Sequence, residues 1–377
     1  MRTLRDITHL EGVPVLVRAA LNVPIKNGKV ANTFRLRAAL PTIEYLRSRS
    51  AKVILIGHIG DTGTETLAPV VEALRALVPS ITFATDAIGP EARRAVRDMV
   101  PGDVLVLENL RRHAGEKGND PAFAAELASL ADAFVQDSFD VCHREHASVV
   151  GVPRLLPSYA GLQLELEMRE LGKALKPKRP ALAIIGGAKF ATKEPVLAML
   201  MGRYDTVFVG GALANDFVQA KGMPVGTSLV SSVPTRSLHA LAKNPKLMLP
   251  ADYVVAPLGS RRTEGRIAVV DDVRPDEAIL DDGPQTIERL AALSARAKTI
   301  LWNGPLGNYE NGFTEATEAL ARVIASSDAH TIIGGGDTVA AIEKLGFADD
   351  MSFISTGGGA MLDFLADGTL PGVDALL

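Results

Sequence analysis

Residues 331–340 read TIIGGGDTVA, and this stretch carries the strongest signal for the fold. The β-branched residues at 331–333 are typical of the end of a buried strand. Three glycines follow, which lets the backbone turn sharply and approach a ligand closely. The next residues have helical composition, so Asp337 lies near a helix N-terminus, where unpaired N–H groups and the helix dipole favour an anion such as phosphate. Asp337 can cap that helix, or it can hold a Mg²⁺ that phosphates bring with them.

The same order of strand, glycines and helix recurs in the second half of the chain. It is found at 184–189 (IIGGAK), 207–213 (VFVGGAL) and 354–361 (ISTGGGAM), and a related strand end runs into a glycine-proline turn at 302–307 (WNGPLG). None of these turns is a Walker A loop, and none is a clean G-x-G-x-x-G after the first strand, so a dinucleotide site is not indicated. Five such turns predict a parallel sheet whose strand ends together form one ligand crevice.

Composition and charge limit the classes of function. A chain of 377 residues is long for one hydrophobic core and predicts roughly two domains. A net charge of −4 without a long basic run argues against nucleic-acid binding. The single cysteine, Cys142, allows no intrachain disulfide, the N-terminus lacks a signal-peptide core, and no apolar run approaches the roughly 20 residues that cross a bilayer. We therefore expect a cytoplasmic protein that acts on small molecules, with no nucleic-acid or membrane partner.

The first half alternates short apolar runs with helical stretches, which predicts a parallel sheet covered by helices on both faces. The predicted strands are 13–18, 52–58, 103–108 and 133–136, and the predicted helices are 33–49, 67–77, 90–99 and 121–130.

Polar residues follow each of these four strands. They are Asn22 and Arg35, then His58 and Asp61, then Arg111 and Arg112, then Asp137, His143, Arg144 and His146. The C-terminal ends of parallel strands share one edge of a sheet, so the arginines and histidines should form one basic pocket. Guanidinium groups match phosphate and carboxylate oxygens, so this pocket suits a small anionic acid. For each arginine taken alone, the alternative is a solvated surface residue.

The second half begins after an amphipathic run that predicts a linking helix. The predicted domains are 1–157 for the acid, 158–176 for the helix and 177–362 for a nucleotide, with a tail at 363–377 that would find a docking surface on the first domain. The predicted strands of the second domain are 181–185, 206–209, 253–256, 267–270, 299–302, 331–333 and 352–355.

Several residues of the second half suit a nucleotide. Lys189 and Lys193 lie one helical turn apart, which suits a polyphosphate, with a solvated pair as the alternative. The glycines before Ala212 would let an adenine or ribose lie against the backbone. Glu310 is a candidate acceptor for a ribose hydroxyl, with a solvated loop acid as the alternative.

Taken together, these motifs resemble those of the phosphoglycerate kinase family over nearly the whole chain. The matching segments, in order, are VLVRAALNVP, RLRAALPTIEYL, KVILIGHIG, LENLRRH, DSFDVCHREHAS, IIGGAKFATK, VGGALANDF, KTILWNGPLGNYE, IIGGGDT, ISTGGGAMLDFL and LPGVDAL. The resemblance implies α/β architecture, with two Rossmann-like three-layer α/β/α domains that have parallel sheets and are joined by a helix across a deep cleft. It also implies a monomeric enzyme of glycolysis that reversibly transfers a phosphoryl group between MgATP and the carboxylate of 3-phosphoglycerate.

The resemblance assigns roles to particular positions. Arg35 would stabilise charge at the carboxylate of the acceptor, and Lys189, Gly336 and Gly359 would act on the phosphoryl group in transfer. Asp337 would hold Mg²⁺. The acceptor would be held by Asn22, His58, Arg111 and Arg144, and the nucleotide by Gly187, Ala188, Lys193, Gly211, Asn303, Pro305, Glu310, Gly334, Gly335, Asp337 and Thr338.

These roles are chemically reasonable without reference to a family. A carboxylate is already a nucleophile, so the reaction requires no general base. Charge neutralisation and in-line placement remain, and Lys, Arg and Mg²⁺ supply them. Because the two predicted pockets lie in different halves, transfer requires closure of the cleft.

The acceptor side departs from the family pattern. RAALNVP stands where the family has RVDFNVP, so Ala20 replaces an aspartate, and HIGDT stands where it has HLGRP, so Asp61 replaces an arginine. Arg112, Asp140 and Glu145 are further departures. Three functions remain open: a phosphoglycerate kinase, an acyl-phosphate-forming kinase of the same family for a different small carboxylic acid, and a nucleotide-binding relative without catalysis.

Overall fold

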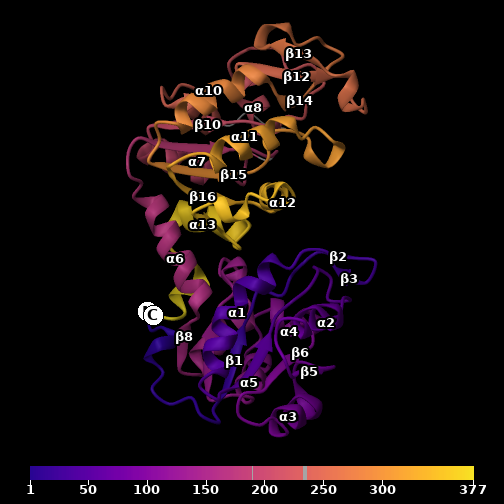
Figure 1. Cartoon of the computed structure of the whole chain (residues 1–377), viewed down its shortest axis with the longest axis vertical. Helices are drawn as coiled ribbons and strands as arrows, with labels where there is room; N and C mark the ends of the chain where they lie inside the picture. Colours follow the sequence, from indigo (N-terminus) through magenta and orange to yellow (C-terminus); the bar gives the residue numbers. More distant parts are fainter. Residues whose placement is uncertain (189, 232–235) are drawn as a thin grey trace. The chain divides into compact units, whose positions relative to one another are not determined.

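The chain forms two structural units, and the computed structural model describes residues 1–188, 190–231 and 236–377 of it. Unit 1 comprises Met1–Arg169 together with Thr369–Leu377, and unit 2 comprises Glu170–Gly368. In Figure 1 the first part of unit 1 is coloured indigo to purple, and unit 2 runs from magenta to yellow. Lys189, one of the predicted catalytic residues, lies outside the described residues.

Unit 1 is built on a six-stranded parallel sheet. Its strands, in spatial order, are β5 (Ile81–Ala84), β6 (Val104–Leu107), β4 (Lys52–Ile56), β1 (Pro14–Arg18), β7 (Ala133–Gln136) and β8 (Ser158–Ala160). The helices of this unit include α1 (Phe34–Arg47), α2 (Ala68–Arg75), α3 (Gly89–Arg97), α4 (Ala114–Lys117) and α5 (Pro121–Ala128). The central strands are apolar along almost their whole length because a parallel sheet is covered on both faces.

The four strands and four helices predicted for the first half are all present, to within two residues at each end. Two strands of the sheet were not predicted. β5 is short, with one exposed position, and β8 falls within the segment that was predicted to begin the linking helix. Ser158–Ala160 instead pairs with β7 at the edge of the sheet, so the helix α6 runs only from Leu162 to Leu175.

Unit 2 contains a second six-stranded parallel sheet. Its strands, in spatial order, are β11 (Leu247–Met248), β10 (Thr206–Val209), β9 (Ala181–Ile185), β15 (Thr299–Asn303), β16 (His330–Gly334) and β17 (Phe353–Ile354). Numbered along the chain within the sheet, this is the order 3-2-1-4-5-6 of a Rossmann fold. The helices of the unit include α7 (Glu194–Arg203), α8 (Ala212–Ala220), α9 (Arg236–Ala242), α10 (Pro284–Ser294), α11 (Glu315–Ala325), α12 (Gly336–Leu345) and α13 (Gly359–Asp367). The fold class predicted from the sequence is therefore confirmed: each unit is an α/β structure around a parallel sheet.

A three-stranded sheet in unit 2 is antiparallel, and the sequence did not indicate it. It has the order β13 (Arg266–Val269), β12 (Asp252–Ala256) and β14 (Ala278–Asp282), and in Figure 1 it lies at the opposite end of unit 2 from α13. Two of these strands, β12 and β13, were predicted to within one residue at each end, but the prediction gave them no pairing partner. A short apolar run has the same pattern in either kind of sheet, so only its pairing partner decides the direction.

The C-terminal tail packs within unit 1. The backbone N–H of Gly372 donates to the carbonyl oxygen of Cys142 at 2.8 Å, and Leu370, Val373 and Leu376 are buried. The short helix α14 (Pro371–Asp374) carries these contacts. Within the described residues, no helix has both the length and the apolar character needed to span a membrane.

Asp137, directly after β7, makes the stability of unit 1 dependent on pH. Its Oδ1 accepts hydrogen bonds from Thr42 Oγ1 at 2.8 Å and from the Gln163 N–H at 2.9 Å, while its Oδ2 has no partner among the described residues. Burial raises the pKa of this carboxyl to about 7. Between about pH 4 and pH 7, the Asp137 carboxyl therefore keeps its proton in the folded chain, whereas in the unfolded chain the same carboxyl has lost it.

We expect Asp137→Asn to gain stability relative to the parent chain as the pH rises. The stabilisation from the held proton is complete below about pH 4 and is lost as the pH rises through 7, whereas asparagine stays neutral throughout. The difference in unfolding free energy should grow by roughly 2–4 kcal/mol between pH 4 and pH 8. Urea denaturation at several pH values, followed by circular dichroism, measures it. Asp132→Asn, at an exposed neighbouring position, is the control, and an equal pH response of the two variants would contradict the prediction.

Candidate functional site

A cluster of four arginines and one histidine lies near the C-terminal ends of the strands of unit 1. We call it the cationic cluster; it consists of Arg18, Arg35, His58, Arg111 and Arg144. The chain switches from one side of this sheet to the other between the adjacent strands β1 and β7, and such a switch point is where open α/β sheets bind ligands. All four arginines are close enough to lower the pKa of His58. The structure thus brings together Arg35, Arg111, Arg144 and His58, which the sequence predicted for an acid-binding pocket, and adds Arg18 to them.

Arg18, the last residue of β1, fixes the orientation of His58. Its side chain is fully buried and donates to Ser148 Oγ at 3.0 Å, to the Ala19 carbonyl at 2.9 Å and to His58 Nδ1 at 3.0 Å. A guanidinium group only donates, so Nδ1 of His58 accepts and Nε2 carries the proton. Burial, with the surrounding arginines, holds the pKa of His58 far below its usual range, so the ring is a neutral donor.

Arg18 is not among the residues that the sequence predicted for this pocket. Its position, as a charged residue at the end of an otherwise apolar strand, could have indicated a role in the pocket. Such a residue is more often exposed to solvent, so the sequence alone does not single it out. Only the folded structure shows that this guanidinium is enclosed.

Arg35 lies in the first turn of α1 and bridges several loops. Its Nη1 donates to the Asn22 carbonyl at 2.8 Å, and Asn22 Oδ1 in turn accepts from the Gly60 N–H at 3.2 Å. Nη1 also lies 3.5 Å from Asp140 Oδ2, in an ion pair. The Arg35 side chain remains 26% exposed, so an anion can still reach it.

Arg111 is enclosed but only partly bonded. Its side chain is 1% exposed, and Nη1 contacts the Gly60 carbonyl and donates to Asp61 Oδ1 at 2.8 Å. Its Nε and Nη2 are buried and have no hydrogen-bond partner among the described residues. Unsatisfied buried donors are costly, so this guanidinium is suited to an anionic or polar ligand. Arg144, after β7, keeps its Nε 3.3 Å from His143 Nε2.

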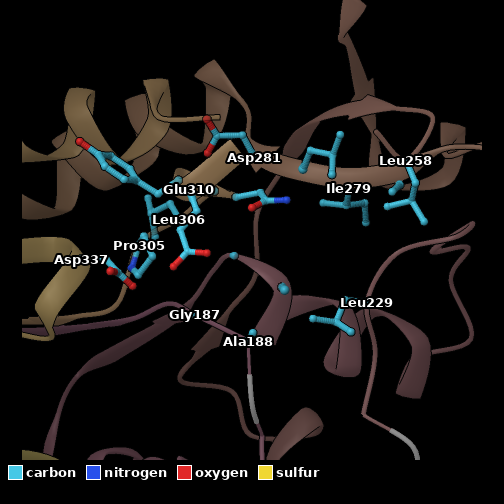
Figure 2. A pocket seen from close by; sticks show the side chains of 17 residues that line it. Gly187, Ala188, Leu229, Leu258, Ile279, Asp281, Pro305, Leu306, Glu310 and Asp337 are labelled. Carbon is cyan, nitrogen blue, oxygen red and sulfur yellow. The ribbon is translucent and has the colours of Figure 1, made fainter. Parts of the chain in front are cut away.

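Unit 2 contains a separate pocket of about 640 Å³ at the C-terminal ends of its strands, a volume typical of small-molecule sites. Six of the residues predicted for the nucleotide line it: Gly187, Ala188, Gly211, Pro305, Glu310 and Asp337. Figure 2 shows Asp337, Pro305 and Glu310 gathered at one end of this pocket, which we call the glycine-turn end.

The glycine-turn end lies where the Rossmann strand order reverses, between β9 and β15. The turns after these strands touch: the Gly186 N–H donates to the Asn303 carbonyl and the Gly187 N–H to the Pro305 carbonyl, both at 2.9 Å. A Cβ on Gly186 would lie 2.1 Å from the Pro305 oxygen, so a larger residue would force the turns apart. The glycine pattern of the sequence therefore has a direct steric reason.

The other end of the pocket is apolar and was missed by the sequence analysis. It is formed by Leu229, Leu258, Ala278, Ile279 and Leu280, and Figure 2 shows Leu229, Leu258 and Ile279 together there. Leu229 and Leu258 are 62% and 65% exposed, which is unusual for leucine. An exposed apolar lining of this kind suits the flat faces of a purine base. The antiparallel sheet supplies most of it, so no local sequence signal could have found it.

The remaining described residues that were predicted for the nucleotide or for the phosphoryl group in transfer do not line the pocket directly. They are Lys193, Asn303, Gly334, Gly335, Gly336, Thr338 and Gly359. Several of them support the turns: Thr338 Oγ1 accepts from the Gly304 N–H at 3.0 Å, Lys193 Nζ donates to the Gly186 carbonyl, and Asn303 is buried beside Met361. Burial lowers the pKa of Lys193 to about 8, and the nearby Asp337 acts in the opposite direction.

Asp337 is one of the acidic residues that line this pocket, together with Asp281 and Glu310. It lies in the first turn of α12 and is exposed to solvent. No group of three or more His, Cys, Asp or Glu side chains with metal-site geometry occurs among the described residues. Mg²⁺ that accompanies nucleotide phosphates needs only one or two protein carboxylates, so a single exposed aspartate fits such an ion.

The whole chain is similar to phosphoglycerate kinases. The family model described as "Phosphoglycerate kinase" matches residues 4–368. The phosphoglycerate kinase of Moorella thermoacetica is 45% identical over 99% of this chain and 98% of its own length, and that of Pelotomaculum thermopropionicum is 44% identical over 100% and 99%. Among solved structures, the phosphoglycerate kinase of Pyrococcus horikoshii OT3 has a TM-score of 0.91 at 30% identity, covering 100% of this chain and 98% of its own, and that of Coxiella burnetii has 0.84 at 36%, covering 99% and 98%.

Proposed function

Because the chain belongs to the phosphoglycerate kinase family of carboxyl-acceptor phosphotransferases, we propose that its two units divide that reaction between acceptor and nucleotide. Unit 1 binds 3-phosphoglycerate through the cationic cluster, and unit 2 binds MgATP in the pocket between the glycine turns and the apolar end. The observation that carries this assignment is the separation itself. The arginines suited to an acid lie in unit 1, whereas the glycine turns and Asp337 lie in unit 2.

In unit 1, each member of the cluster has a role that follows from its contacts. Arg35, at the start of α1, stabilises negative charge on the acceptor carboxylate as the phosphoryl group arrives. Arg111 and His58 bind the phosphate end of the acid, which lies away from its carboxylate and which we call the far end. Arg111 offers its two unpartnered nitrogens there, and His58 offers its Nε2–H. Asn22 holds Arg35 and the Gly60 turn in place.

In unit 2, the base packs against the apolar leucines and the phosphates lie along the glycine turns. The N-terminus of α12 presents unpaired N–H groups and a positive dipole end toward the phosphates. Asp337 would hold a Mg²⁺ that reduces the charge on those phosphates, and Glu310 accepts a ribose hydroxyl. We assign Lys189 to the phosphoryl group in transfer from its position in the motif alone.

The two substrates must meet for an in-line transfer. Since the acceptor carboxylate is itself the nucleophile, this chain needs to supply placement, charge and exclusion of water rather than a base. We infer that the units approach each other during turnover, and that the chain works as a cytoplasmic monomer.

The test is to incubate the full chain with MgATP and 3-phosphoglycerate in the presence of hydroxylamine, which traps an acyl phosphate as a hydroxamate. We expect ADP and hydroxamate to form together, and only when the acid is present. ATP binding without ADP formation from any small carboxylic acid would contradict the proposal and would support a binding protein without catalysis. A different carboxylic acid as the preferred acceptor is the second candidate, since two carboxylates are paired with arginines of the cluster.

A further inference from the structure

Two arginines of the cationic cluster already have a carboxylate partner from this chain. Asp61 pairs with Arg111 at 2.8 Å, and Asp140 pairs with Arg35 at 3.5 Å. Both acids are positions at which the sequence departs from the family pattern. The two pairs lie on different arginines, so they affect different parts of the acceptor.

In the ion pair between Asp61 and Arg111, the carboxylate is exposed to solvent and the guanidinium group is buried. The Asp61 side chain is 90% exposed, whereas that of Arg111 is 1% exposed. An anion that approaches the guanidinium group of Arg111 from solvent therefore meets a carboxylate that is already bound at Nη1. A phosphate carries a charge of about −1.5 to −2 at neutral pH, so it is repelled more strongly than a neutral group.

A hydroxyl group meets the opposite situation at the same place. The exposed carboxylate of Asp61 can accept a hydroxyl proton, and the guanidinium group of Arg111 that it contacts can donate to the hydroxyl oxygen. One neutral O–H can thus use both members of the pair, whereas a phosphate can use only the arginine.

We propose that Asp61 sets the acceptor preference of this chain, because its pairing with Arg111 weakens the hold on a phosphate-bearing acid and favours a hydroxy acid without phosphate. This inference rests on the proposed function and on the placement of Arg111 at the far end of the acceptor. Asp140 acts differently: it lies beside Arg35 at the carboxylate end, which both kinds of acid share, so it does not discriminate between them.

The test compares two acceptors in the full chain, 3-phosphoglycerate and D-glycerate, at fixed MgATP and ionic strength. We expect measurable turnover of both acids by the parent chain. In Asp61→Asn, the ratio of kcat/KM for 3-phosphoglycerate to that for D-glycerate should rise about tenfold, the size expected from removing one screened like-charge contact with a dianion. The gain should appear mainly in KM for 3-phosphoglycerate and should shrink at high salt.

Two matched variants separate this effect from general damage. Asp140→Asn should change kcat/KM for both acids by the same factor, so their ratio should stay constant. Asp98→Asn removes an exposed acid that pairs with Arg94 at 3.7 Å in α3, and it should change neither value. Calorimetric binding of 3-phosphoglycerate without nucleotide provides a second readout, in which Asp61→Asn should bind more tightly than the parent chain.

Each result decides the inference. A ratio that stays within twofold in Asp61→Asn, or that changes equally in Asp140→Asn, overturns it while leaving the kinase function intact. Absence of a parent-chain product from D-glycerate also overturns it. If neither acid is phosphorylated, the proposed function and the inference fail together, and that result is distinguishable because ADP formation itself is then missing.

Discussion

Arg35→Ala is expected to lower kcat for phosphoryl transfer by about 1,000-fold, the low end of the range for arginines that stabilise phosphoryl-transfer transition states. Arg35 opens α1, keeps a quarter of its side chain exposed and is anchored through the Asn22 carbonyl. It can therefore meet the carboxylate end of the acceptor, where negative charge is redistributed during transfer. Since that interaction strengthens in the transition state, the loss should appear in kcat more than in KM.

Arg35→Lys tests the geometry separately from the charge. A lysine keeps the positive charge but loses the planar fork, so we expect only partial recovery, to about one tenth of parental kcat or less. The control is Arg37→Ala, two residues further along α1, whose exposed side chain bonds only to Thr33 among the described residues. Steady-state kinetics with both substrates varied gives the answer. A kcat within threefold of the parent value in Arg35→Ala would remove Arg35 from the mechanism.

Asp337→Asn is expected to lower kcat/KM for MgATP by about 100-fold, comparable to the loss of one preorganised electrostatic contact. Asp337 lies at the glycine-turn end of the pocket in unit 2 (Figure 2) and in the first turn of α12. Its exposed carboxylate is an oxygen donor of the kind that a hard divalent cation prefers. An amide binds Mg²⁺ more weakly than a carboxylate does, so the variant should also need a higher Mg²⁺ concentration for half-maximal rate.

The Mg²⁺ titration distinguishes a metal ligand from a helix cap. If Asp337 served only to cap α12, the variant would lose thermal stability but would keep the parental Mg²⁺ dependence. Asp350→Asn, at an exposed acid of the same unit, is the control and should change neither property. A rate loss in Asp337→Asn with an unshifted Mg²⁺ requirement would contradict the metal role.

The sequence predicted most strands of both parallel sheets and the main helices of the first half, because their periodicity is local. The runs at 181–185 and 206–209 have the same bounds in the structure as in the prediction. The errors fall where local pattern and tertiary pairing disagree. Ser158–Ala160 continues an amphipathic helix pattern yet pairs with β7, and β12 and β13 look like parallel core strands yet form an antiparallel sheet.

The candidate site was predictable where a residue type and a chain position both point to it. Arg35 and Arg111 follow strands of unit 1 and Asp337 follows a strand of unit 2, so the edge of each sheet that carries them could be inferred. Arg18, Leu229 and Leu258 could not be inferred, because the first looks like a strand end and the leucines look like ordinary core residues. Their roles depend on burial and exposure, which are properties of the folded chain.

By itself, the sequence determined the α/β class, the family and the glycine turns, because these depend on periodicity and on short motifs that fold locally. Tertiary structure alone decided which arginines have a carboxylate partner. Asp61 and Arg111 are 50 residues apart along the chain, and Arg35 lies in α1 whereas Asp140 lies in the turn after β7, yet each pair is in contact. The physical reason is that Coulomb energy depends on distance in space and on local exposure to water, neither of which is encoded in the spacing of residues along the chain.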